Sequence, residues 1–241
     1  MRYYIITGTS KGLGRSIAQK LIQKPGNFVI GVSRSASLTS DHYVHVNLDL
    51  SDLTTLNKNY DKIFPKFDNP EKIVLINNAG TMGEISYLGN ITDESIILGY
   101  NCNVIAPAML MNEFVKRYKE LSCPKVVVNV SSGAGKKPVD GWLTYCSTKS
   151  ALDMLTAVAA KEAKFSHTNF RFYSVSPGIV DTEMQTKIRN VSPEDFSRVE
   201  EFINYKKEHM LDSPDKVAEK YIQFLEHDEM VKGVVLSVRE I

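Results

Sequence analysis

The sequence has no long apolar run and no excess of charge of one sign. No segment approaches the roughly 18 uncharged apolar residues that a membrane-spanning helix requires. The 29 Lys and Arg residues are balanced by 28 Asp and Glu residues, for a net charge of +1, which argues against a basic surface for nucleic acid. The amino-terminal segment MRYYIITG also lacks the apolar core and cleavage site of a signal peptide. These absences predict a protein of the cytoplasm that binds neither nucleic acid nor membranes.

Cysteine is scarce. Cys102, Cys123 and Cys146 are odd in number and have no C-x-x-C spacing, which argues against a disulfide framework and against a structural zinc site. We expect three reduced thiols, of which Cys146 is the one to test for redox sensitivity. His42 and His45 lie three residues apart in an expected strand and would face opposite sides of it, so no metal site is predicted.

The chain has the size and composition of one globular domain, with 241 residues, 43% of them apolar and 24% charged. Short β-rich segments alternate with longer segments of helical periodicity. The expected strands are Tyr3–Thr7, Phe28–Val32, Tyr43–Val46, Ile73–Asn77, Lys125–Val130, Arg171–Ser176 and Val234–Val238. The expected helices include Leu13–Ile22, Val104–Tyr118, Tyr145–Ala163 and Pro214–Phe224.

Strand followed by helix, repeated along the chain, predicts right-handed crossovers and a parallel sheet. We therefore predict an α/β fold: a single-domain, Rossmann-type, doubly wound parallel sheet of seven strands with helices on both faces, over residues 1–241. Residues 181–213, between the sixth and seventh strands, depart from the alternation. They are polar with a helical pattern and are long enough to form a lid. Ligands of such sheets bind outside the carboxyl ends of the strands.

The first expected strand leads into TGTSKGLGRS, in which Gly8, Gly12 and Gly14 form a G-x-x-x-G-x-G pattern before a helix. Glycines let the backbone turn tightly and approach a pyrophosphate, and the start of a helix favours negative charge. An ordinary glycine-rich turn is the alternative. The position of the pattern at the first strand-to-helix junction favours nucleotide binding.

The second expected strand ends without the acidic residue that would bind the ribose of NAD. Ser33 and Arg34 follow it, and Lys11 adds a cation in the glycine loop. A guanidinium group matches a 2′-phosphate in charge and in geometry. We therefore predict NADP(H) as the cofactor; the alternative is that Arg34 is a solvated loop residue.

Tyr145 is the only one of the eleven tyrosines that is followed four residues later by a lysine, Lys149. At this spacing on a helix the two side chains share a face. A free phenol has a pKa of about 10, and a nearby ammonium group favours the phenolate. Such a pair could transfer a proton near neutral pH. For so short a pattern, a solvated helix face is the alternative.

Five patterns occur in order: the glycine loop, NNAG after the fourth strand, a serine thirteen residues before Tyr145, the tyrosine–lysine pair, and SPGIVDT at the end of the sixth strand. Together they resemble the short-chain dehydrogenase/reductase family over nearly the whole chain. The resemblance implies a reductase in which Ser132 orients and polarises the substrate carbonyl and Tyr145 donates the proton. It implies that Lys149 lowers the pKa of the tyrosine and holds the nicotinamide ribose. Asn103 matches the asparagine of the proton relay, with Asn101 as a nearby competitor.

The same resemblance implies that several segments contact the cofactor. These are the phosphate loop, the adenine pocket, the segment that passes the cofactor, and the nicotinamide site. In that order, the matching residues are Gly8, Ser10, Gly12, Leu13 and Gly14; Asp49 and Leu50; Asn77, Ala79 and Gly80; and Pro177, Gly178, Ile179 and Thr182.

Trp142, the only tryptophan, lies three residues before Tyr145. We expect Val139, Leu143 and Met184 as its neighbours, and an aromatic wall would suit a flat, apolar carbonyl compound. The alternative is that Trp142 packs in an oligomer contact or a surface groove. Trp142 and Met184 are our candidate substrate residues.

A narrower resemblance, carried by RYYIITGTSKGLG, SSGAGKKP and SPGIVDTEMQ, is to bacterial benzil reductases and their relatives, the sepiapterin reductases. It implies NADPH-dependent reduction of one carbonyl of an aromatic or apolar 1,2-diketone, which for benzil gives benzoin. A pterin or another ketone is the alternative substrate. A noncatalytic NADPH-binding sensor is the alternative of another class, and the intact serine, tyrosine and lysine argue against it.

Members of the family are commonly dimers or tetramers, so a homodimer or homotetramer is expected. Small residues along one predicted helix would permit close helix packing between subunits. They are Ala151, Ala157, Ala159, Ala160 and Ala163.

Overall fold

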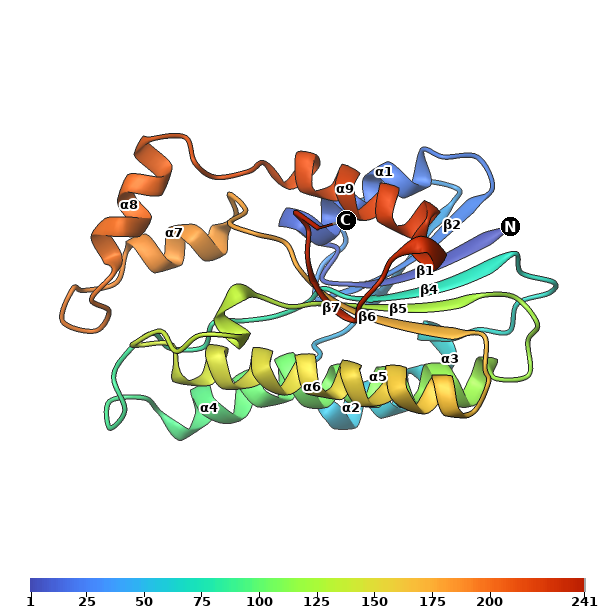
Figure 1. The fold of residues 1–241 in the computed structure, drawn as a ribbon, viewed down its shortest axis with the longest axis horizontal. Coiled ribbons are helices and arrows are strands. Elements are labelled where there is room, and N and C mark those ends of the chain that lie inside the picture. The colour runs from blue at the N-terminus through green and yellow to red at the C-terminus, as the bar shows by residue number, and fades with distance from the viewer. Residues whose placement is uncertain (241) are drawn as a thin grey trace.

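The computed structural model describes residues 1–240, which form one seven-stranded sheet whose strands are all parallel (Figure 1). The strands are β1 (Arg2–Thr7), β2 (Asn27–Ser33), β3 (Tyr43–Asn47), β4 (Lys72–Asn77), β5 (Lys125–Val130), β6 (Phe170–Ser176) and β7 (Val235–Ser237). Their order across the sheet is β3-β2-β1-β4-β5-β6-β7. Each strand agrees with its prediction to within one residue at either end, and the doubly wound fold is confirmed.

Helices cover both faces of the sheet (Figure 1). On one face lie α1 (Gly12–Ile22) and α9 (Pro214–Glu226), and on the other lie α2 (Leu53–Lys58), α3 (Tyr60–Ile63), α5 (Ala106–Tyr118) and α6 (Leu143–Phe165). β5 is buried at every position. A near-continuous β-branched strand such as KVVVNV is typical of a sheet that is covered on both sides.

Short helices between β3 and α5 were not part of the prediction: α2, α3 and α4 (Asp93–Tyr100). They lack a long apolar period, but two have a capping signal in the sequence. The Asp52 side chain accepts a hydrogen bond from Thr55 N at 3.0 Å, and Thr92 Oγ1 accepts one from Ser95 N at 3.3 Å. Such caps satisfy backbone N–H groups that a helix leaves free at its start. They could have located both helices.

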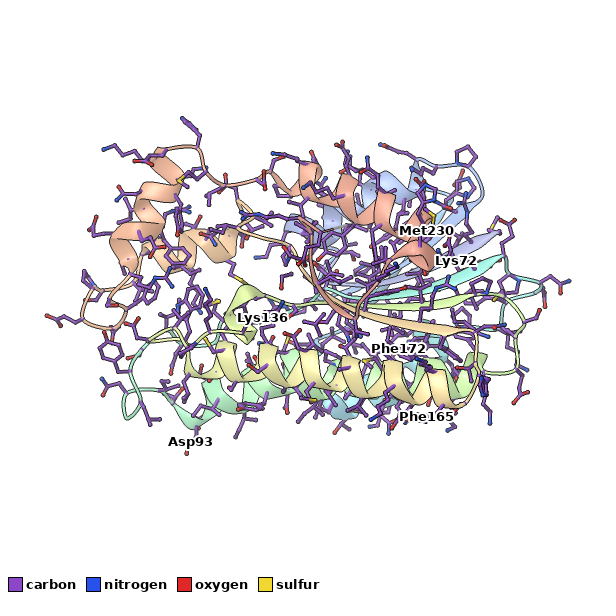
Figure 2. The ribbon with its side chains drawn as sticks, in the orientation of Figure 1. Lys72, Asp93, Lys136, Phe165, Phe172 and Met230 are labelled. Atoms are coloured by element: carbon purple, nitrogen blue, oxygen red, sulfur yellow. The ribbon has the colours of Figure 1, made fainter. Side chains whose placement is uncertain are left out.

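Three alanines of α6 pack against the core of their own chain, although the sequence suggested a contact between subunits. Ala159, Ala160 and Ala163 pack against the core between the sheet and α5, so they support packing within the chain. The outer surface of α6 instead carries larger apolar side chains, with Met154 65% and Phe165 74% exposed. Figure 2 labels Phe165 at the carboxyl end of the helix.

Residues 181–213 contain α7 (Glu183–Arg189) and α8 (Val199–Lys207), which lie beyond the carboxyl ends of the strands (Figure 1). Two hydrogen bonds connect this segment to the loop that follows β4. Lys187 Nζ donates to the Gly83 carbonyl at 2.6 Å, and Ser86 Oγ donates to the Asp195 carboxylate at 2.7 Å. The predicted helical content is present, and the two helices stand where a ligand of this sheet would bind.

A buried carboxylate connects β4, β6 and the segment before β7. Asp228 is fully buried and forms ion pairs with Lys72 and Arg171; Figure 2 labels Lys72. The Tyr173 hydroxyl donates to the Asp228 carbonyl at 2.7 Å. Removing one partner of a buried ion pair costs about 3 to 5 kcal/mol, because a charge is left uncompensated.

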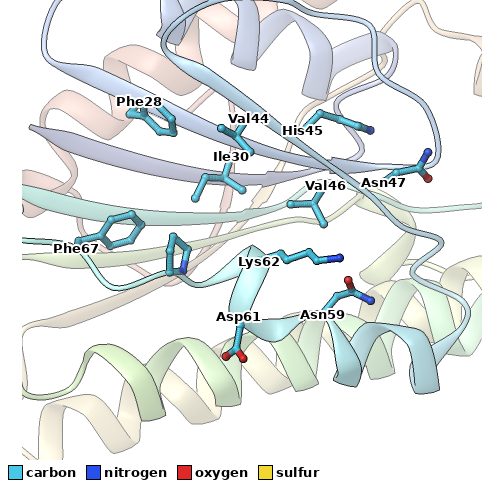
Figure 3. Close-up of a pocket in the computed structure, with 11 residues that line it drawn as sticks. Phe28, Ile30, Val44, His45, Val46, Asn47, Asn59, Asp61, Lys62 and Phe67 are labelled. Carbon is cyan, nitrogen blue, oxygen red and sulfur yellow. The ribbon is translucent and has the colours of Figure 1, made fainter.

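A cavity of about 530 Å³ lies at the β3 edge of the sheet, between β2, β3 and the chain around α3 (Figure 3). Strand residues such as Ile30 and Val46 give it an apolar floor, and Asn59, Asp61 and Lys62 add polar side chains. None of the predicted site residues lines it. The predicted cofactor residues lie instead around the carboxyl ends of the strands.

Candidate active site

The strand order reverses between β1 and β4, so the loops that follow these two strands flank the switch point of the sheet. The glycine loop follows β1 and the NNAG motif follows β4. In the same layer, Asn77 Nδ2 donates to Asn129 Oδ1 of β5 at 2.8 Å. Parallel pairing thus brings the predicted cofactor segments and the end of β5 to one edge of the sheet.

The glycine loop needs its glycines. Gly8 and Gly12 have φ of +74° and +58°, which L side chains rarely adopt. A Cβ on Gly14 would lie 2.2 Å from Asn78 Nδ2 and 2.4 Å from the Gly8 carbonyl oxygen. Asn78 Nδ2 itself donates to the carbonyls of Thr7 at 2.9 Å and Gly8 at 3.3 Å. Asn78, which the sequence reasoning passed over in favour of Asn77, is therefore the residue that holds the loop.

The start of α1 has the chemistry of an anion site. Its N-cap residue, Lys11, makes no side-chain hydrogen bond to the first turn, and that turn has no acidic residue. Backbone N–H groups at such a helix start suit a pyrophosphate. Ser10, Leu13 and the three glycines of the loop lie at this junction, so the residues present fit the predicted cofactor.

The two residues predicted to bind the 2′-phosphate, Ser33 and Arg34, differ in exposure. Arg34 has a side chain that is 75% exposed, with Nη1 3.9 Å from the Asp49 carboxylate. Ser33, in contrast, is buried, and its hydroxyl donates to the Ser35 carbonyl at 3.0 Å. Ser33 and Arg34 thus stand together at the end of β2, and their contact with the cofactor stays a prediction.

Lys11, also predicted as a cation of the cofactor site, forms an ion pair in this structure. It pairs with Glu183 at the start of α7, and both side chains are more than half exposed. A Cβ on Gly12 would lie 3.3 Å from Thr182 Cγ2. The loop after β6, predicted to contact the nicotinamide through Pro177, Gly178, Ile179 and Thr182, therefore reaches the phosphate loop.

Tyr145 lies in the first turns of α6 and Lys149 one turn later, both buried, at 8% and 4% exposure. Lys149 Nζ is 5.6 Å from the centre of the Tyr145 ring and donates to the Val130 carbonyl at 2.7 Å. Ser132 is the N-cap of a short helical turn, and its Oγ accepts a hydrogen bond from Ala134 N at 3.2 Å. The solvated-face alternative for the pair does not hold, because both side chains lie inside the protein.

Burial raises the pKa of Tyr145 above its ordinary value, and a hydrogen bond with Ser132 opposes this rise. Burial also lowers the pKa of Lys149 to about 8, opposed by Cys102 and Asp153. That Lys149 lowers the pKa of Tyr145 stays a prediction, which its place 5.6 Å from the ring centre allows. Burial penalises the charged form of each group, so it acts in opposite directions on the pKa values of the phenol and the ammonium group.

The side chains of Asn103 and Asn101, the two candidates for the proton relay, have different hydrogen-bond partners. Asn103 is buried in the π-helical turn Asn101–Ile105, where its side chain bonds both the N–H and the carbonyl of Thr81, each at 2.8 Å. A Cβ on Gly80 would lie 3.3 Å from Asn103 Oδ1 and 3.6 Å from Lys149 Nζ. Asn101 instead donates to the Ser51 carbonyl at 3.2 Å. Asn103 thus neighbours Lys149, at a π-turn of the kind frequent at functional sites.

Trp142 joins Tyr145 to the 181–213 segment. Its ring stacks on Phe196 at 5.3 Å, meets Tyr145 edge-to-face at 5.7 Å, and contacts Phe202 at 5.5 Å between ring centres. Val139 and Met184 pack against this cluster, as expected. Leu143, expected beside them, is 44% exposed. Sequence reasoning missed the two phenylalanines, which come to Trp142 only through the fold.

Within residues 1–240, no helix is long and apolar enough to cross a membrane, and no group of three His, Cys, Asp or Glu side chains is placed to hold a metal ion. The three cysteines are unpaired thiols.

A glycine loop at the switch point of a doubly wound sheet, together with a buried tyrosine and lysine, is the arrangement of an α/β oxidoreductase that works on a bound nicotinamide cofactor. Comparison with known proteins gives the family. Residues 2–192 match the family model described as short chain dehydrogenase, and the chain belongs to that family.

Relatives of known activity align over most of their length. The chain is 38% identical to the (S)-benzoin-forming benzil reductase of Bacillus cereus, with 100% of both chains covered. It is 30% identical to the sepiapterin reductase of Meriones unguiculatus, covering 95% of this chain and 93% of that one. Among solved structures, a short-chain dehydrogenase/reductase of Saccharomyces cerevisiae has a TM-score of 0.84 at 26% identity, over 99% and 96% of the two chains.

Proposed function

We propose that the protein is an NADPH-dependent carbonyl reductase that reduces one carbonyl of an aromatic or apolar 1,2-diketone. The observation that carries this is the position of Tyr145, which is in contact with an aromatic cluster on one side and Lys149 on the other. The benzil reductase of Bacillus cereus, similar over the whole chain, supports the diketone. Tyr145 thus has an aromatic neighbour suited to an apolar substrate and a cationic neighbour suited to proton transfer.

The side chains divide the chemistry as follows. When bound, the reduced nicotinamide supplies a hydride to the carbonyl carbon. The hydroxyls of Ser132 and Tyr145 stabilise the negative charge that develops on the oxygen, and Tyr145 then donates its proton. The raised pKa of Tyr145 keeps that proton in place at neutral pH. Lys149 holds a positive charge beside the ring, and Asn103 fixes the backbone next to it.

Arg34 supports NADPH over NADH. Its guanidinium is exposed beside Asp49, and β2 ends without the acid that would bind a free ribose. Residues 181–213 would act as the lid, since they cover Trp142 with Phe196 and Phe202. The exposed apolar residues of α6, such as Met154 and Phe165, support a homo-oligomer, and the unpaired cysteines support the cytoplasm.

A pterin reductase is the second candidate, favoured by the similarity to sepiapterin reductase. A substrate panel separates the candidates: benzil, 2,3-butanedione, sepiapterin, a quinone and an oxoacyl thioester, each with NADPH and with NADH. Loss of reduced-nicotinamide absorbance and the appearance of benzoin from benzil are the expected results. Turnover of sepiapterin alone would favour the second candidate. NADPH binding without turnover of any substrate would favour a sensor.

A further inference from the structure

The indole N–H of Trp142 is a buried hydrogen-bond donor without an acceptor. Trp142 is only 7% exposed, and within residues 1–240 its Nε1 has no partner. A buried tryptophan usually places this group on an acceptor, and leaving it unpaired costs about 1 to 3 kcal/mol. A group of this kind calls for an explanation, and a ligand is one.

The indole ring of Trp142 lies in a cluster of buried apolar side chains. The buried members of its cluster are apolar apart from the Tyr145 hydroxyl. They are Met82, Ile85, Ala134, Ile188, Phe196, Val199 and Phe202. Phe196 lies flat against one face of the indole, at an interplanar angle of 24°. These apolar side chains offer Nε1 no acceptor, and a molecule that enters the cluster would supply one.

The position of the indole relative to Tyr145 limits what that molecule can be. The two rings are perpendicular, at 89°, with centres 5.7 Å apart. A molecule whose carbonyl meets the hydroxyls of Ser132 and Tyr145 would therefore lie next to a ring that contacts Trp142. In a 1,2-dicarbonyl compound, the second acceptor oxygen is on the adjacent carbon.

We propose that Trp142 Nε1 donates a hydrogen bond to the second carbonyl oxygen of a vicinal dicarbonyl substrate, and so selects dicarbonyls over simple ketones. This inference rests on the proposed carbonyl reductase function. A site built around a buried donor rejects an analogue that lacks the acceptor, because the donor is then left unpaired. Trp142 is thus a specificity residue that orients the substrate, and its aromatic faces serve to hold the 181–213 segment.

The test compares two substrates in two variants. Benzil and 1,2-diphenylethanone have the same two phenyl rings, but the second compound has a single carbonyl. Trp142→Phe keeps an aromatic ring and removes the donor, while Phe196→Leu disturbs the stacking and leaves the donor. We expect Trp142→Phe to lower kcat/KM about three- to tenfold more for benzil than for the monoketone, the range of one neutral hydrogen bond. Phe196→Leu should lower both values alike.

Equal losses for both substrates in Trp142→Phe would overturn the inference while leaving the reductase function intact. Absence of benzil reduction by the wild type would instead overturn the proposed function, so the two failures are distinguishable.

A second measurement needs no variant. Because Trp142 is the only tryptophan, the wild-type protein labelled with nitrogen-15 gives one indole N–H resonance. With NADP⁺ present to prevent turnover, benzil should move its proton resonance downfield, and 1,2-diphenylethanone should not. The same shift with both compounds, or none with either, would overturn the proposal even if Trp142→Phe did not fold.

Discussion

The cofactor side and the substrate side of the candidate site are built by different means. The cofactor side consists of backbone: the glycine loop, uncapped α1 and the turn after β4, held by hydrogen bonds between neighbouring segments. The substrate side consists of side chains, in which Trp142 meets Phe196 and Phe202 from the 181–213 segment. Backbone sites leave a signature in local sequence, whereas side-chain clusters depend on the tertiary fold. The sequence therefore suggested individual residues for the first, whereas it gave the second only in outline.

Removing the proposed proton donor should give the largest effect and should leave the cofactor side intact. Tyr145→Phe keeps the ring contact with Trp142 and removes the hydroxyl, so kcat should fall by roughly 10² to 10⁴. NADPH affinity, measured by fluorescence titration, should stay within about twofold. Tyr60→Phe, on α3, is the control and should behave as wild type. Retained turnover in Tyr145→Phe would remove the tyrosine from this role.

The converse variant should affect the cofactor side alone. Arg34→Ala removes an exposed guanidinium proposed to bind the 2′-phosphate, and a charged hydrogen bond is worth about 1.5 to 3 kcal/mol. NADPH should therefore bind about 10- to 150-fold more weakly, with NADH nearly unchanged. Lys116→Ala removes a similar exposed charge from α5 and serves as the control. Equal losses for both cofactors would show that Arg34 supports the fold of the loop.

The pH dependence should report Lys149, where the two sides meet. Its ammonium group is lost as the pH rises through about 8, while Tyr145, with its raised pKa, keeps its proton there. We expect kcat/KM for reduction to be level below that pH and to fall by about tenfold per pH unit above it. In Lys149→Arg, which keeps its charge, the fall should move to higher pH. An unchanged profile in that variant would assign the titration to another group.

The smallest effect should come from the contact between the two sides. Glu183→Gln breaks the ion pair with Lys11 and frees that lysine for a cofactor phosphate. Exposed pairs are weak, so NADPH should bind about two- to fivefold more tightly at low salt. The gain should vanish at high salt, where exposed charges are screened. Glu200→Gln on α8 is the matched control, and an equal gain there would indicate a general charge effect.

Particular residues show how far the sequence could be interpreted. Gly8 and Gly12 were predictable, because only glycine readily adopts their positive φ. Choosing between Asn77 and Asn78 was not, since both are amides at a strand end. The strand pairing turns Asn77 toward Asn129 and leaves Asn78 for the glycine loop. The raised pKa of Tyr145 was equally out of reach, because residue spacing gives no measure of burial.

The seven strands were predicted closely for a related reason. Each is a short β-branched run bounded by polar or turn residues, and parallel strands that are buried on both faces require such runs. The helices α2 and α4 were not predicted, because short helices depend on capping and tertiary packing more than on a periodic pattern of apolar residues. Phe196 and Phe202 lie far along the chain from Trp142, and no local pattern connects them.

The buried ion pairs of Asp228 have a consequence for the order of events during synthesis. Lys72 and Arg171 belong to strands that leave the ribosome well before residue 228, yet both depend on this one carboxylate for their partner. Until it arrives, burying these two cations is unfavourable, and β6 has an unpaired edge where β7 will add. Such exposed edges invite aggregation and engage chaperones. We therefore expect the central sheet to close late, and a nascent chain stalled before residue 228 to remain sensitive to protease.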